Sequence, residues 1–104
     1  MSTPNGSGLS FSIINISSAG DNVIVPGTRS GLVVRRVVLA LEQQTTVQFK
    51  AGNRDLSGPM PIDSLGLGFS DQAYYAVDPD EDFIISLGDA VQAGGTVWYQ
   101  RGPL

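Results

Sequence analysis

The longest patterned stretch of the chain runs from Leu32 to Lys50 and contains two different arrangements of apolar residues. Its first half, which ends at Leu41, has β-branched and other apolar residues on both alternating faces and contains no Gly, Pro, Asn or Asp. Such a composition is typical of a central strand that is covered on both sides. After the polar residues 42–44, apolar and polar positions alternate from Thr45 to Lys50, which predicts a second strand with one buried face. We therefore predict two antiparallel strands joined by a tight polar turn.

The pair Arg35-Arg36 lies inside this apolar stretch and conflicts with a fully buried strand. An unpaired charge in a protein interior is costly, so each guanidinium needs a carboxylate partner or a path to water. Two arrangements satisfy this requirement: both side chains extend to solvent at a strand end, or one pairs with an acid across a subunit boundary. Arg35 and Arg36 are therefore candidate interface residues.

The N-terminal part of the chain divides into two segments of different composition. Residues 1–8 are rich in Gly, Ser, Pro and Asn, which predicts a flexible arm. This arm is either a disordered tail or a segment that orders against a neighbour. From Leu9 onward, apolar residues occupy the odd positions, including Phe11 and Ile13, so we predict a half-buried strand whose odd-numbered face packs on the core.

The rest of the chain consists of short apolar segments separated by turns rich in Gly, Pro and Asp. These segments are 22–25, 60–62, 63–70, 73–77, 83–87 and 96–101. Prolines around Met60 restrict that segment to an edge strand or an extended loop. About seven to nine short strands at roughly ten-residue spacing predict a single all-β domain, residues 9–104, with a β-sandwich or jelly-roll-like architecture of antiparallel strands.

Composition removes several classes of function. The 104 residues include no Cys and no His, so the usual nucleophile–base pairs cannot be assembled and the commonest metal ligands are missing. We therefore expect no enzymatic activity, no catalytic residues, no cofactor and no metal site. The net charge of −4 disfavours nucleic acid as a partner, and no apolar run reaches the roughly 18 residues of a membrane span.

The acidic segment Asp78–Asp82 has four carboxylates in five residues and allows two interpretations. Carboxylate oxygens are hard donors that suit Ca²⁺, but the segment lacks the spacing and the glycine of the twelve-residue calcium loop. The other interpretation is a solvated turn.

Two pairs of adjacent aromatic residues provide further candidate interface positions. Neighbours on a strand point to opposite faces, so one member of the pair Tyr74-Tyr75 and one of Trp98-Tyr99 should lie in the core. The other member faces outward, where it either packs at the rim of the core or contacts a sugar or a protein. The candidate interface set is Arg35, Arg36, Tyr74, Tyr75 and Trp98.

Five segments, within about the last seventy residues of the chain, resemble small virion proteins of tailed bacteriophages. They are residues 33–41 (VRRVVLAL from Val34), 45–52 (TTVQFKAG), 56–61 (LSGPMP), 66–69 (GLGF) and 90–99 (AVQAGGTVWY). The aromatic-bearing loop of that family is replaced here by residues 70–75, so the partner surface stays open and no functional residue is carried over.

The resemblance implies a β-sandwich or jelly-roll protein without catalysis. In particular, it implies a capsid decoration (cement) protein that self-associates as a homotrimer, contacts the major capsid protein and stabilises the head shell. Its location would be the virion, after assembly in the host cytoplasm. The alternative is a module of the tail or fibre that binds carbohydrate through Tyr74, Tyr75 or Trp98.

Overall fold

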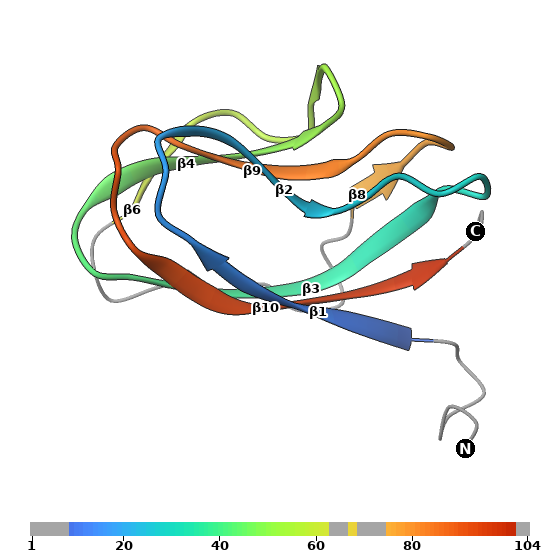
Figure 1. Cartoon of the computed structure of the whole chain (residues 1–104), viewed down its shortest axis with the longest axis horizontal. Coiled ribbons are helices and arrows are strands. Elements are labelled where there is room, and N and C mark those ends of the chain that lie inside the picture. The colour runs from blue at the N-terminus through green and yellow to red at the C-terminus, as the bar shows by residue number, and fades with distance from the viewer. Residues whose placement is uncertain (1–8, 63–66, 69–74, 102–104) are drawn as a thin grey trace.

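The computed structural model describes residues 9–62, 67–68 and 75–101, and these residues form ten β-strands and no helix (Figure 1). The strands are β1 (Leu9–Ile16), β2 (Gly20–Val25), β3 (Leu32–Leu41), β4 (Thr45–Ala51), β5 (Arg54–Asp55), β6 (Met60–Ile62), β7 (Leu67–Gly68), β8 (Tyr75–Val77), β9 (Phe83–Leu87) and β10 (Ala93–Arg101). None of the described residues belongs to a helix that could cross a lipid bilayer. The arm expected at residues 1–8 and most of the strand expected at residues 63–70 lie outside the described residues.

The strands form two antiparallel sheets that face each other (Figure 1). In sheet A the order is β1-β10-β3, and both β7 and β8 pair with the far side of β3. In sheet B the order is β2-β9-β4, and both β5 and β6 pair with the far side of β4. The predicted all-β sandwich is therefore confirmed. Eight of the strands have three or more residues, which agrees with the expected number.

The predicted hairpin between β3 and β4 is wrong, because the two strands belong to different sheets. The polar residues 42–44 do make a tight connection, but it crosses from sheet A to sheet B. The return crossing, from β9 to β10, lies against it: the Glu42 amide donates to the Gln92 carbonyl at 3.0 Å, and the Gln92 amide donates to Glu42 Oε1 at 2.9 Å. Thr45 is buried beside this crossing and donates to Asp89 Oδ2 at 2.9 Å. Two crossings that satisfy each other's polar groups close this end of the sandwich.

The opposite end is closed in the same way, by the connection from β2 to β3 and the acidic connection from β8 to β9. The Asp80 amide donates to the Thr28 carbonyl at 2.7 Å. The Gly27 amide donates to Asp82 Oδ1 at the same distance. Any side chain at Gly27 would collide with the backbone of Asp80, since a Cβ there would lie 2.8 Å from the Asp80 carbonyl carbon. The two connections are thus in direct backbone contact.

The core is built around Phe49, which is fully buried in the middle of β4. Its ring meets the edge of Tyr75 from sheet A, with 5.5 Å between ring centroids, and lies 5.8 Å from Phe83 of β9. The predicted alternation in β4 is confirmed, because its odd positions are buried and its even positions are half-buried. The aromatic cluster therefore joins the two sheets.

The face predicted to be buried in β1 is wrong. Ile14 is buried and Ile16 packs against the core, whereas Phe11 is 63% exposed and Ile13 is 73% exposed. The strand has apolar residues at both parities near its end, so alternation alone does not choose the inner face. The even positions face the core because Ile13 pairs with Thr96 of β10, and Thr96 alternates with the buried Val97.

We predict that Phe49→Ala lowers the free energy of unfolding by about 3–5 kcal/mol, because it removes a buried ring and leaves a cavity. The matched control is Phe11→Ala, which removes the same ring from an exposed position and should change stability by less than about 1 kcal/mol. Urea denaturation of both variants at low protein concentration measures the difference. Equal losses for the two substitutions would contradict the assignment of the inner faces.

Gly95 of β10 has no space for a side chain. Its φ is +152°, and a Cβ at this position would collide with the carbonyl oxygen of Val38. We expect Gly95→Ala to destabilise the protein by roughly 1–3 kcal/mol through backbone strain and displacement of β3. Gly58→Ala is the control, since nothing lies within 4 Å of a Cβ at that position. Thermal unfolding checks both, and a Gly95→Ala variant as stable as the Gly58→Ala variant would rule out the close contact.

Candidate functional site

The Arg35-Arg36 pair lies at a β-bulge in the middle of β3, not at a strand end. Tyr99 pairs with Val34 and its neighbour Trp98 pairs with Arg36, so Arg35 is an extra residue on the β3 side. A bulge of this kind changes which face the following side chains occupy. Val34 on one side of the bulge and Val37 on the other are both buried, although strict alternation would place them on opposite faces.

Both arginines have local partners within the chain. Arg35 Nη1 donates to Gln100 Oε1 at 3.2 Å, and the Arg36 guanidinium lies over the Trp98 ring, 5.0 Å from its centroid. Arg36 is exposed, and the structure brings it together with Trp98 on the outer face of sheet A. The interpretation that both side chains reach water at a strand end is wrong, because the pair lies in the middle of β3 and Arg35 is half-buried. Pairing with an acid of another subunit stays a prediction.

The outer face of sheet A carries two cross-strand rows that we call the apolar face. The strand register places Phe11, Trp98 and Arg36 in one row. It places Ile13, Thr96 and Val38 in the next row, and Val38 is 37% exposed. Three of the four large apolar side chains that are exposed among the described residues belong to this face. Contiguous exposed apolar side chains of this kind mark interaction surfaces more often than scattered ones.

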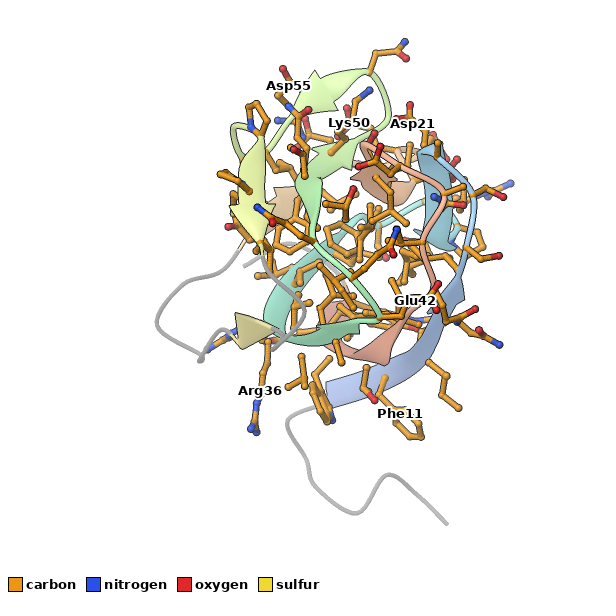
Figure 2. The ribbon with its side chains drawn as sticks, turned by 90° about the vertical axis from the view of Figure 1, so that its left-hand side faces the viewer. Phe11, Asp21, Arg36, Glu42, Lys50 and Asp55 are labelled. Atoms are coloured by element: carbon orange, nitrogen blue, oxygen red, sulfur yellow. The ribbon has the colours of Figure 1, made fainter. Side chains whose placement is uncertain are left out.

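Charge is distributed unevenly between this face and the rest of the molecule. The five strands of sheet A contain three arginines and no carboxylate, although the chain has a net charge of −4. Figure 2 shows Arg36 and Phe11 pointing away from the body of the sandwich, whereas Asp21 and Asp55 lie on the opposite side, on strands of sheet B. The apolar face can therefore approach another surface without bringing any carboxylate from the sheet A strands with it.

The other predicted interface residues have different surroundings. Tyr99 is buried and Trp98 lies outward, which confirms the expected division of this pair. Tyr75 packs on Phe49 at the core, and burial raises the pKa of its phenol. Tyr75 is thus not part of the apolar face. Tyr74 lies outside the described residues.

The acidic segment Asp78–Asp82 holds the end of the sandwich together through its own side chains. Glu81 Oε1 accepts from Arg54 Nη2 at 2.6 Å and from the Asp78 amide at 2.9 Å. Asp82 accepts from the Gly27 amide, as described above. Among the described residues, no group of three or more acidic side chains converges in a way that could hold a metal ion. Cation binding by this segment has no geometric support in this part of the chain.

Phe11, Ile13 and Val38 were not predicted from the sequence as surface candidates. A signal for the first two was present, since β1 has apolar residues at both odd and even positions and only one set can face the core. Val38 gave no such signal, because both alternating faces of β3 carry apolar residues.

Comparison of the sequence with protein-family models and with curated proteins finds no match. The candidate site is therefore defined by its geometry alone.

The ion pair between Arg54 and Glu81 should contribute to the pH dependence of the free energy of unfolding at acidic pH. The hydrogen bond from Arg54 lowers the pKa of Glu81 below its usual value in the folded protein. A lowered folded-state pKa stabilises the protein above the unfolded pKa, and this stabilisation is lost as pH falls through the folded pKa. We expect Glu81→Gln to flatten the fall in stability between about pH 5 and pH 3, a small effect because the pair is partly solvated.

The measurement is urea denaturation at a series of pH values. Asp55→Asn serves as the control, because it removes a carboxylate from the same end of the sandwich and leaves the Arg54–Glu81 pair intact. If Glu81→Gln retains the full pH dependence of the parent protein, the pair does not contribute in this range.

Proposed function

We propose that this protein is a non-enzymatic structural protein of a bacteriophage virion, a capsid decoration protein that self-associates and stabilises the head shell. The observation that carries the proposal is the apolar face of sheet A, where Phe11 and Ile13 are 63% and 73% exposed beside Trp98 and Val38. A decoration protein acts by burying such a surface against its neighbours. Each square ångström of apolar surface that is buried contributes about 25 cal/mol, which raises the barrier to rupture of the shell.

The apolar face also limits the chemistry of the shell surface that it fits. The matching surface is apolar at its centre, to cover Phe11 and Ile13, and carries a carboxylate near the rim for Arg36. Arg36 is held in place by its contact with Trp98, so part of the ordering cost of this long side chain is met before binding. The major capsid protein is the proposed partner, and the resemblance to phage virion proteins implies a trimer as the assembled form.

A second candidate, a carbohydrate-binding module of a tail or fibre, is favoured by one observation. Trp98, which is the only tryptophan of the chain, is half-exposed on the apolar face opposite Phe11. Exposed aromatic rings stack on sugars. The Arg36 guanidinium already occupies a position over the Trp98 ring, which reduces the area left for a saccharide. Because Trp98 alone supplies the indole fluorescence, saccharide-dependent quenching would detect this activity directly.

The proposal is tested by mass spectrometry of purified virions and by rebinding of the protein to particles that lack it. We expect the protein in the particles and saturable rebinding. Ile13→Ser should weaken rebinding by roughly tenfold, since it removes most of an exposed apolar side chain from the face.

Val23→Ser is the matched control, because Val23 is 53% exposed on β2 of the other sheet and its loss should leave rebinding unchanged. Absence of the protein from virions would end the proposal. Equal effects of the two substitutions would show that binding does not use the apolar face.

A further inference from the structure

The edge of β1 differs from the other sheet edges in the described part of the chain. Exposed edge strands are templates for pairing with another chain, and proteins protect them by short length, charge, proline or bulges. In sheet B, β2 carries Asp21 and a register shift between Val23 and Val25, and β6 contains Pro61. The strands β5 and β7 have two residues each, and β8 has three.

The strand β1 has none of these features. It spans eight residues, Leu9–Ile16, with no charged residue and no proline, and it pairs with β10 in an unbroken register. Among the described residues it is the end strand of sheet A, so its other edge faces no further strand of that sheet. It also carries Phe11 and Ile13, which are the two most exposed large apolar side chains in the described part of the chain. A long, neutral, apolar edge is the kind that pairs with another strand.

We propose that the β1 edge binds the β1 edge of a second copy of this chain, in antiparallel orientation about a twofold axis perpendicular to the sheet. The second copy is the occupant that the charge distribution favours. The chain as a whole has a net charge of −4 and copies repel one another, but β1 and the apolar face beside it contain no carboxylate. Along this edge, two copies can approach without bringing carboxylates of the sheet A strands against each other.

The register of the pair follows from the alternation of side chains. Strands related by a twofold axis perpendicular to the sheet have their odd positions on the same face, so odd residues lie opposite odd residues. Centring the pair on Ser12 places Phe11 opposite Ile13 of the partner subunit, and does so twice. Pairs of an aromatic with a β-branched residue are among the favourable cross-strand combinations. Centring it on Ile13 instead would place Phe11 opposite the partner's Asn15, so the register centred on Ser12 is preferred.

This pairing joins the two copies of sheet A into one sheet. The row of Arg36, Trp98 and Phe11 then continues into the partner's Ile13, Thr96 and Val38, and the apolar face of the pair is twice as large as that of one copy. The inference depends on the fold and not on a location in the virion. An isologous contact of this kind joins copies in twos, so an assembly of three would need another contact.

The first test is sedimentation equilibrium of the full chain with Ser12→Lys, Ser12→Thr and Gln43→Lys. We expect the parent to be in monomer–dimer equilibrium. Ser12→Lys should weaken dimerisation by roughly fivefold or more, since it places two like charges opposite each other at the centre of the pair. Ser12→Thr keeps a neutral strand former and should retain dimerisation. Gln43→Lys adds the same charge at an exposed position outside β1 and should retain it as well.

The second test does not depend on tolerance of a lysine at the half-buried Ser12 position. The chain contains no cysteine, so a single Ser12→Cys substitution introduces the only thiol. Residues directly opposite in an antiparallel pair are about 4.5–5.5 Å apart at Cα, within the range of a disulfide. Under mild oxidation we expect a covalent dimer from Ser12→Cys and little from Gln43→Cys.

Three outcomes would overturn the proposal: a monomer at every concentration, equal cross-linking from Ser12→Cys and Gln43→Cys, or a dimer or trimer that Ser12→Lys leaves unchanged. These results leave binding to the virion as a separate question, because a monomer that rebinds to particles would contradict the edge pairing and still support the proposed binding to the capsid. A dimer that is absent from virions would support the edge pairing and contradict the proposed function.

Discussion

The bulge at Arg35 is the constraint on which the arrangement of sheet A depends. A regular strand from Leu32 to Leu41 would place Val34 and Val37 on opposite faces, and one of them would be lost from the core. The extra residue lets both point inward and leaves Arg36 on the outer face above Trp98. The bulge thereby accommodates an arginine pair in the longest strand of the sandwich, where Arg36 reaches the outer face and Arg35 donates to Gln100.

The two ends of the sandwich follow a common construction. At each end a connection from sheet A to sheet B lies against a connection in the opposite direction, and the two exchange hydrogen bonds. The acidic segment Asp78–Asp82 belongs to one of these ends, which gives its carboxylates partners in the amide of Gly27 and the guanidinium of Arg54. Among the described residues, acidic groups are thus gathered at the ends and on sheet B, and the five strands of sheet A carry none.

The sequence predicted those features that depend on residues close together in the chain. The alternation in β4, the division of Trp98 and Tyr99 between outside and core, and the edge position of Met60–Ile62 all follow from local periodicity or from proline. The pairing of β3 with β4 and the inner face of β1 were wrong. Both depend on which strand lies beside which, and a three-residue polar connection fits a hairpin and a crossing equally well. The apolar face was missed for the same reason, since its two rows are assembled from three strands that are distant in sequence.

The pairing of β1 with β10 has a consequence for the order in which the molecule can form. Within sheet A, the first described strand, β1, pairs only with the last described strand, β10, and nearly the whole chain lies between them. During synthesis β1 emerges early and stays without that neighbour until β10 has been made, and sequence-distant pairings of this kind form slowly. During this interval the apolar residues of β1 are accessible to other nascent chains. A truncation that removed β10 would therefore leave both β1 and β3 without the strand that pairs with them in sheet A. Such fragments would be prone to aggregate.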